Sequence, residues 1–225
     1  MPARKSPPAL RRAARKKILI VDDHPLMREG LRKTINHEPD LVVCGSAEAA
    51  PQALDAVHKL APDLVLVDVT LPGKSGLELV KDLHVLYPHL LMLVLSMHDE
   101  SLYAERMLRA GARGYLSKQT PTTELIKAIR QVFAGGIYLS PEVSEHLLRR
   151  FSGPVPKNTS PLEILTHREF EIFQLVGGGK SPREIALELH LSPKTVAVHS
   201  TNIRQKLALK THAQLIRFAA RTGDL

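Results

Sequence analysis

Charged and hydroxyl side chains follow a series of short apolar runs in this 225-residue sequence. ILIV precedes Asp22 and Asp23, LVLV precedes Asp68, LMLVL precedes Ser96, and GYLS precedes Lys118. Crowded carboxylates repel one another unless a hard cation lies among them, and Mg²⁺ binds one or two carboxylates together with water and phosphate. A lysine and a serine hydroxyl suit phosphate oxygens. The set therefore predicts phosphate chemistry, with Asp68 as a nucleophile that forms an acyl phosphate.

The apolar runs are the elements that must position these side chains. Together with LVVC from Leu41 they make five, separated by stretches of helical character. This alternation predicts an α/β domain built on a doubly wound five-stranded parallel sheet. Loop residues of such a sheet meet in a crevice beyond the carboxyl ends of its strands. A single aspartate at a strand end is often only a helix cap, but capping does not explain the ordered set.

A resemblance to a known family adds roles to these residues. KKILIVDDH, PDLVLVD followed by TLPGKSG, LVLS and RGYLSK resemble the receiver domain of bacterial two-component response regulators, whose sheet is flavodoxin-like. The resemblance implies that a sensor histidine kinase phosphorylates Asp68. It also implies a Mg²⁺ site formed by Asp23, Asp68 and the backbone carbonyl of Thr70, with Asp22 binding the ion through water.

The same resemblance assigns the remaining polar positions of the sheet edge. Ser96 and Tyr115 match the positions whose side chains change rotamer on phosphorylation, and Lys118 matches the lysine that contacts the phosphoryl group. An aromatic residue in a strand is equally often a packing residue, so Tyr115 keeps both interpretations. Cys44 has no partner for an internal disulfide and is expected to be a small buried residue of the second strand.

The C-terminal part of the chain carries four helix start signals and no strand-like run. Two are the capping pairs Thr166 with Glu169 and Thr211 with Gln214, and two are the caps Ser181 and Ser192, each followed by proline. The second and third helices are separated only by His190 and Leu191. So tight a turn predicts a helix-turn-helix within an all-α domain of four helices.

The third of these helices has two different faces. Val196, Ile203 and Leu207 recur at helical spacing, while small and polar side chains lie around the other side and fit a major groove of double-stranded DNA. Basic residues nearby suit phosphate contacts. The candidate DNA-binding residues are Lys194, Thr195, Ala197, Val198, Thr201, Arg204, Lys206 and Lys210. An ordinary helical domain that binds protein is the alternative.

A second resemblance supports the DNA-binding interpretation. LTHREFEIFQLV and KSPREIALELHLSPKTVAVHSTNIRQKL resemble the LuxR/NarL-type DNA-binding domain, and the pairing with a receiver is that of NarL/FixJ-type regulators. The family implies a recognition helix within residues 192–207 and a last helix that dimerises, giving a homodimer when phosphorylated or bound to DNA. Ala197 and Thr201 depart from it, because some members carry lysine at these positions.

Composition and linker signals divide the chain. We expect a disordered basic tail at 1–16, a receiver domain at 17–134, a linker at 135–160 with a short helix from Glu142 to Arg150, and a DNA-binding domain at 161–225. The net charge is +8, but the first 17 residues hold seven basic and no acidic groups. No run is long enough to cross a membrane, and a lone cysteine suits the cytoplasm.

The pairing predicts a phosphorylation-dependent transcriptional regulator and not an enzyme, so no catalytic residues are assigned. Before phosphorylation, the receiver would either cover the recognition helix or hold the chain monomeric. One alternative is a regulator whose DNA binding does not depend on phosphorylation. The other is a phosphotransfer or protein-interaction module that has lost DNA binding, which Ala197 keeps open. GGGKS at 177–181 lacks the first glycine and the preceding strand of a P-loop.

Overall fold

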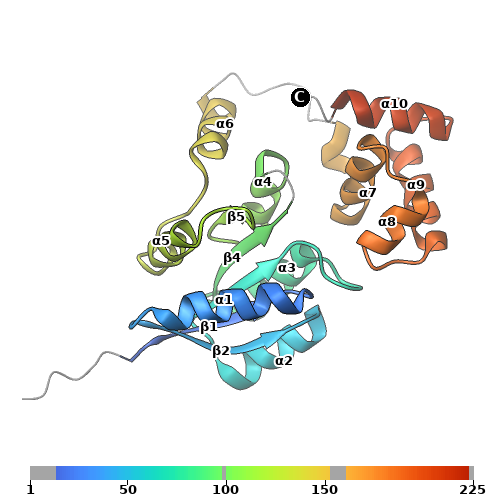
Figure 1. The fold of residues 1–225 in the computed structure, drawn as a ribbon. Coiled ribbons are helices and arrows are strands. Elements are labelled where there is room, and N and C mark those ends of the chain that lie inside the picture. Colours follow the sequence, from blue (N-terminus) through green and yellow to red (C-terminus); the bar gives the residue numbers. More distant parts are fainter. Residues whose placement is uncertain (1–13, 98–99, 153–160, 223–225) are drawn as a thin grey trace, which may run out of the picture.

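The computed structural model describes residues 14–97, 100–152 and 161–222 (Figure 1). All five predicted strands are present, and they form one parallel sheet in the order β2-β1-β3-β4-β5. This is the flavodoxin-like order, in which the chain reverses direction across the sheet between β1 and β3. The strands are β1 (Lys16–Val21), β2 (Leu41–Ala47), β3 (Leu64–Asp68), β4 (Leu91–Ser96) and β5 (Tyr115–Ser117).

Helices cover both faces of the sheet. Successive residues of β1 point into opposite layers: Ile18 and Ile20 pack with α1 and α5, and Leu19 and Val21 pack with α2, α3 and α4. Burial on both sides explains why the strands are continuous apolar runs and not alternating ones. The helices are α1 (Pro25–His37), α2 (Ala50–Leu60), α3 (Gly76–Leu86), α4 (Glu100–Ala110) and α5 (Thr122–Phe133).

The helix expected in the linker is present as α6 (Pro141–Ser152), slightly longer than predicted. Its apolar side chains Val143 and Leu147 are buried, and the helix packs against α4 of the receiver-like part. The linker helix therefore extends the first domain. The predictions for the basic tail and for residues 153–160 fall, except for the last three tail residues, outside the described residues.

The residues described in the C-terminal part form helices joined by short turns. Thr166 and Ser181 each accept a hydrogen bond from the backbone of the glutamate three residues later, and Thr211 and Gln214 bond reciprocally, so the predicted capping pairs are confirmed. A 3-10 turn that the sequence did not predict precedes them. The elements are η1 (Pro161–Ile164), α7 (His167–Gly177), α8 (Pro182–Glu188), α9 (Pro193–Lys206) and α10 (His212–Thr222).

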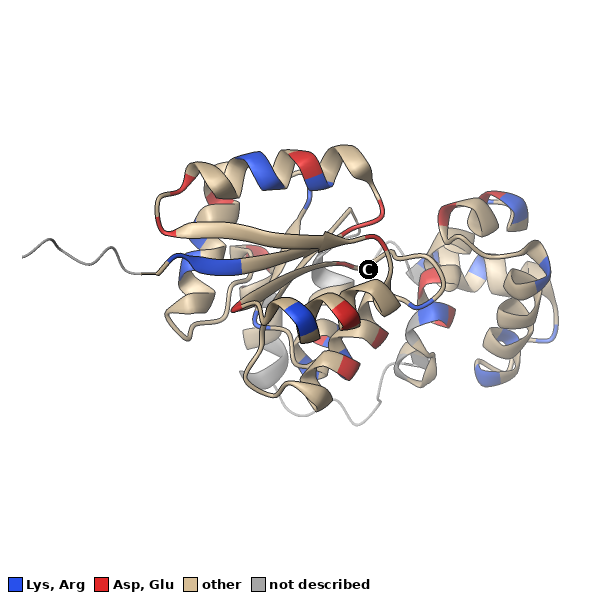
Figure 2. Ribbon diagram, turned by 90° about the horizontal axis from the view of Figure 1, so that it is seen from below, with Lys and Arg blue, Asp and Glu red and all other residues tan. Residues whose placement is uncertain are grey.

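Acidic and basic positions are interspersed along the helices of both parts in the view of Figure 2. Within the described ranges, every helix is too short or too polar to cross a lipid bilayer.

Candidate functional site

Backbone hydrogen bonds join the loops that follow the strands. The N–H of Asp22 donates to the carbonyl of Ala47 at 3.1 Å, and the N–H of Lys118 donates to the carbonyl of Ser96 at 2.7 Å. Asp68 is the last residue of β3 and pairs in register with Leu95, next to Ser96. Asp22, Asp23, Asp68, Ser96 and Lys118 therefore lie at one edge of the sheet, as the sequence predicts.

Lys118 lies between two buried aspartates. Its Nζ is 2.7 Å from Oδ2 of Asp22 and 2.6 Å from Oδ2 of Asp68, and all three side chains are at most 4% exposed. Burial by itself would lower the pKa of Lys118, but the charges of Asp68 and Asp22 outweigh it and raise the pKa. The lysine is therefore a fixed positive charge at this edge.

Asp68 is a buried carboxylate whose ionised form is disfavoured by its surroundings. Burial raises its pKa to about 6, Lys118 opposes the rise, and the negative charge of Asp22 adds to it. The N–H of Thr70 also donates to Oδ1 of Asp68 at 3.2 Å. Near neutral pH the carboxylate is ionised and buried with one cation for two neighbouring charges. Such a group is poised to share its oxygen with an electrophile or a further cation.

The loop after β3 passes close to Asp68 because of a glycine. A Cβ atom at Gly76 would lie 2.0 Å from the carbonyl oxygen of Asp68 and 2.8 Å from Cα of Val69. The N–H of Gly76 donates to the carbonyl of Val69 at 2.8 Å. Any larger residue at position 76 would push α3 away from the acidic edge.

The donor set at this edge suits a hard divalent cation. Ligand atoms of Asp22, Asp23, His24 and Asp68 all lie within 4.8 Å of one another. Oδ1 of Asp23 is buried, and in the part of the chain that is described it faces Nδ1 of the exposed His24 at 2.6 Å, without a backbone or lysine donor. A buried carboxylate oxygen that faces only an exposed side chain fits a Mg²⁺ ligand. The residues present therefore fit the predicted ion.

The sequence did not single out His24, although it directly follows the aspartate pair. Its Nδ1 lies 2.6 Å from Oδ1 of Asp23 and 3.3 Å from Oδ1 of Asp22, while its side chain is 65% exposed. The signal was visible in the DDH triplet. Ser96 and Tyr115 are both fully buried beside the site, so packing and switching remain compatible for Tyr115.

The predicted outer face of α9 is open to solvent. Val196 and Ile203 are buried in the domain core, whereas Ala197, Val198 and Thr201 are exposed. Two of the predicted phosphate-contacting side chains already have partners. Lys206 lies 2.6 Å from the carboxylate of Glu169, and Arg204 donates to the hydroxyl of Thr201. Lys194 and Lys210 are exposed at the two ends of this face.

The helix-turn-helix contacts the acidic edge through its turn. Nε2 of His190 lies 2.8 Å from Oδ2 of Asp23. Beside it, a guanidinium nitrogen of Arg168 donates to the carbonyl of Leu189 at 3.0 Å and to the carbonyl of Gly73, in the loop after β3, at 3.4 Å. His190 adopts a left-handed backbone with φ of 52°. Nothing in the sequence signalled this contact, because it joins residues far apart in the chain.

A second contact joins α4 to the start of the C-terminal part. Arg106 donates to the carbonyls of Leu162 at 2.7 Å and Leu165 at 3.2 Å. Its guanidinium carbon lies 4.0 Å from the ring centroid of Phe170, and Tyr103 packs edge-on against the same ring at 5.5 Å. These contacts use α7 and η1, so the expectation that the receiver covers the recognition face of α9 is not what the structure shows.

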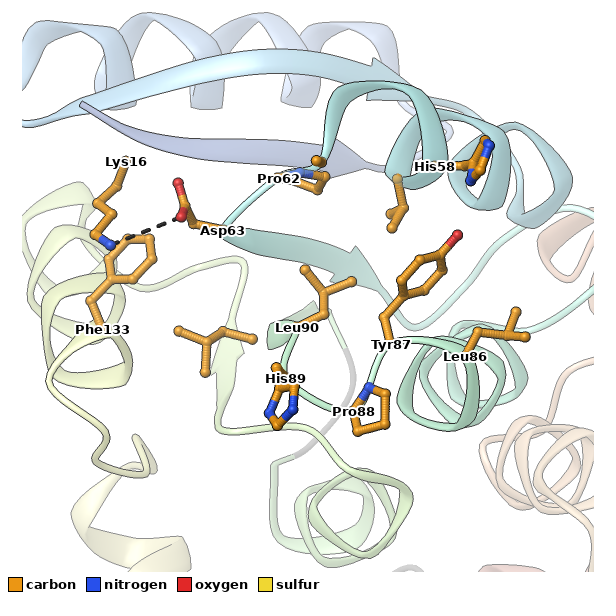
Figure 3. Close-up of a pocket in the computed structure, with 13 residues that line it drawn as sticks. Lys16, His58, Pro62, Asp63, Leu86, Tyr87, Pro88, His89, Leu90 and Phe133 are labelled. Atoms are coloured by element: carbon orange, nitrogen blue, oxygen red, sulfur yellow. Dashed lines mark ion pairs between the residues drawn. The ribbon is translucent and has the colours of Figure 1, made fainter. Parts of the chain in front are cut away.

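The opposite edge of the sheet carries a groove of a different character (Figure 3). Its volume is about 630 Å³, and apolar and aromatic side chains such as Tyr87 and Phe133 line most of it. The ion pair drawn there joins Lys16 and Asp63 at 3.9 Å, with side chains 55% and 40% exposed. No group of metal-binding residues like that of the carboxyl edge is found elsewhere in the described residues. The metal-binding group found in the described residues therefore lies at the carboxyl edge.

Comparisons with known proteins agree with this geometry. The family model "Response regulator receiver domain" matches residues 18–130, and the model "Bacterial regulatory proteins, luxR family" matches residues 163–219. The transcriptional regulatory protein DegU of Brevibacillus brevis is 36% identical over 220 residues, covering 92% of this chain and 93% of DegU. The chain belongs to the NarL/FixJ family of two-component response regulators. Its receiver and LuxR-type DNA-binding domains are the two parts described above.

Other relatives of this response regulator also cover most of its length. The oxygen regulatory protein NreC of Staphylococcus carnosus is 36% identical over 208 residues, covering 90% of this chain and 96% of NreC. Among solved structures, RcsB from Salmonella enterica serovar Typhimurium bound to promoter rprA with phosphomimetic BeF₃⁻ has a TM-score of 0.61 and 25% identity. That match covers 92% of this chain and 98% of RcsB.

Proposed function

We propose that this response regulator switches its binding to double-stranded DNA through phosphorylation of Asp68 by a sensor histidine kinase. The observation that carries the proposal is the placement of Asp68, buried at the carboxyl edge of the sheet against Lys118 and within reach of the Asp23 carboxylate. The proposal assigns Asp68 as the phosphoryl acceptor and Asp23 to the metal site. It makes the chain a regulator and not a hydrolase.

In the transfer, a carboxylate oxygen of Asp68 attacks the phosphorus of a phosphohistidine on the kinase. The new O–P bond forms as the N–P bond breaks, and the kinase histidine leaves with the electron pair and takes up a proton. The pKa of about 6 means that Asp68 is ionised near neutral pH and needs no base to activate it. Lys118 stands where it can pair with the phosphoryl oxygens that arrive on Asp68.

Asp23, Asp68 and the backbone carbonyl of Thr70 would hold a Mg²⁺ ion, with Asp22 acting through water. When bound, the ion neutralises charge on the carboxylates and on the phosphoryl oxygens. The donor chemistry supports this assignment, because Oδ1 of Asp23 is a buried carboxylate oxygen that, in the described chain, faces the exposed imidazole of His24 and no lysine or backbone donor.

Phosphorylation would act on the domain contacts through the two switch residues. Ser96 would turn toward the phosphoryl group and Tyr115 would follow into the vacated space, which changes the surface of α4 and β5. Arg106 and Tyr103, the residues of α4 that touch the C-terminal part, lie on that surface. To shift the protein from about 1% to about 99% of the released state, the phosphoryl group must favour that state by about 5.5 kcal/mol.

The released domain would bind DNA as a homodimer formed through α10. The outer face of α9 would enter the major groove with Ala197, Val198 and Thr201, and Lys194, Thr195, Arg204, Lys206 and Lys210 would lie along the backbone. With Ala197 and Thr201 both short, few side chains reach base edges.

We place the protein in the cytoplasm, with the domain boundaries at residues 17, 134 and 161 and the basic tail before them.

The proposal is tested by fluorescence anisotropy with DNA from upstream of the protein's own gene. Binding is measured with and without a small-molecule phosphodonor and Mg²⁺, for wild type and for Asp68→Ala. We expect the phosphodonor to tighten binding at least about tenfold for wild type only, which corresponds to about 1.4 kcal/mol.

The control is Asp63→Ala, which removes an exposed aspartate at the other edge of the sheet and leaves the acidic cluster intact. This variant should respond to the phosphodonor as wild type does. Equal binding of wild type under all conditions, or a phosphodonor response that survives in Asp68→Ala, would overturn the proposal.

A further inference from the structure

Both carboxylate oxygens of Asp23 face an imidazole. His24, on the same loop, lies 2.6 Å from Oδ1, and His190, from the turn of the helix-turn-helix, lies 2.8 Å from Oδ2. The Asp23 side chain is only 12% exposed with both rings in place. His190 comes from the other domain, so this contact exists only while the two domains are docked.

A hydrated Mg²⁺ ion and this arrangement compete for the same space. The ion requires near-octahedral geometry with oxygen ligands at about 2.0–2.1 Å, and it keeps several of its waters. A ring nitrogen at 2.8 Å from Oδ2 occupies a position that those waters would take. One imidazole must therefore withdraw when the ion binds. His24 belongs to the same loop and is 65% exposed, so it can turn away locally, whereas His190 can leave Asp23 only if the contact between the domains loosens.

We propose that His190 acts as a latch, through which domain docking and divalent-cation binding compete for the carboxylate of Asp23. This inference rests on the Mg²⁺ site proposed above. Binding of the ion displaces His190 and loosens the turn between α8 and α9, before any phosphoryl group is present. Docking, in turn, weakens the affinity of the site for the ion by the same factor, since coupling between two binding equilibria is reciprocal.

The latch is one of two separate contacts, so the ion alone does not free the C-terminal domain. Arg168 is linked to the latch, because it bonds the carbonyl of Leu189 next to His190 and also the carbonyl of Gly73. The contact made by Arg106 on α4 lies elsewhere, on the carbonyls and the aromatic ring of η1 and α7. The ion loosens the first contact, and the change of α4 on phosphorylation loosens the second. Full release therefore requires both events.

The test uses the full-length chain without phosphodonor. Dissociation constants for Mg²⁺ are measured by isothermal titration calorimetry for wild type, His190→Gly and His190→Asn. Both replacements tolerate the left-handed backbone at position 190 and remove the imidazole. We expect His190→Gly to bind Mg²⁺ at least about fivefold more tightly than wild type, because the ion no longer competes with the imidazole.

The matched control is Ala208→Gly, which relieves the same backbone conformation at an exposed position of the same domain, with φ of 54°. It should bind Mg²⁺ as wild type does. Equal affinity of wild type and both His190 variants would overturn the latch, as would tighter binding in His24→Ala, titrated alongside, but not in the His190 variants. Absence of Mg²⁺ binding in every variant would instead overturn the metal site itself.

Discussion

The two edges of the sheet are made by the same strands, but charged side chains are buried at one edge and partly exposed at the other. At the carboxyl edge, Lys118 lies within 2.7 Å of Asp22 and Asp68, and all three are buried. At the amino edge, Lys16 and Asp63 are 3.9 Å apart and roughly half exposed. Water and salt screen the second pair, so it contributes little to stability. The first is a cluster whose energy depends on each of its members.

The difference separates stability from function within one sheet. A fold that only needed the strands could leave apolar side chains at the carboxyl edge as well. Instead the receiver buries two carboxylates with one lysine and keeps Asp68 at a pKa of about 6. Strain of this kind persists only where the site uses it, because selection for stability alone would remove it.

Removal of the buried cation should have the largest effect. Lys118→Met leaves Asp22 and Asp68 buried without a positive partner, and breaking a buried ion pair on one side costs about 3–5 kcal/mol. We expect a loss of stability in this range at pH 8 in EDTA, measured by urea unfolding. Because Mg²⁺ supplies positive charge to the same carboxylates, adding it should restore part of the loss.

The sign of the pH response distinguishes this account from simple loss of packing. Acidification protonates the unpaired carboxylates, so the gap between Lys118→Met and wild type should narrow as the pH falls toward 5. A gap that stays constant with pH would show that the aliphatic stem of Lys118, and not its charge, stabilises the edge.

Replacement of Asp68 by a neutral residue should stabilise the folded protein, in contrast to Lys118→Met. The pKa of Asp68 is raised from 3.8 to about 6, so the ionised form is disfavoured in the folded protein. The stability that this group contributes is fully present below pH 3.8 and is lost as the pH rises through about 6. Asp68→Asn avoids that loss. We expect a gain of about 1–3 kcal/mol at pH 7.5 without Mg²⁺, measured by thermal unfolding.

The matched control for this gain is Asp63→Asn at the amino edge. Asp63 accepts a hydrogen bond from the backbone N–H of Lys17 at 2.7 Å, so its replacement should be neutral or mildly destabilising at every pH. If Asp68→Asn were less stable than wild type at pH 7.5, the bond to Lys118 would outweigh the cost of burial, and the carboxyl edge would not be strained.

The sequence predicted the residues of the carboxyl edge well because the positions of the strands and of the loops after them follow from local patterns. Five apolar runs and the residues directly after them sufficed to bring Asp22, Asp68, Ser96 and Lys118 together. The capping pairs likewise predicted where α7, α8 and α10 begin, since a cap is made within four residues of chain. The phosphate-binding roles stay predictions, because they come from the family resemblance and not from a bound group.

The contacts between the domains could not be predicted in the same way. His190 appears in the sequence as a turn residue, and Arg106 as an ordinary charge on an amphipathic helix. Their partners Asp23 and the carbonyl of Leu165 are fixed by docking of two domains, which leaves no period or spacing in the sequence. The same holds for Lys206, whose pairing with Glu169 depends on how α9 packs on α7.

The smallest change in stability is expected at the amino edge, where loss of a charge should leave the free energy of unfolding almost unchanged. Lys16→Met removes an exposed pair with Asp63 and a cation 5.6 Å above the ring of Phe133, while the aliphatic stem is retained. Exposed ion pairs contribute about 0–1 kcal/mol. The free energy of unfolding, measured with urea, should therefore change by less than about 1 kcal/mol, and the change should show no trend between pH 5 and 8. A loss comparable to that of Lys118→Met would show that charge supports the fold at both edges, and the burial at the carboxyl edge would then have no special link to function.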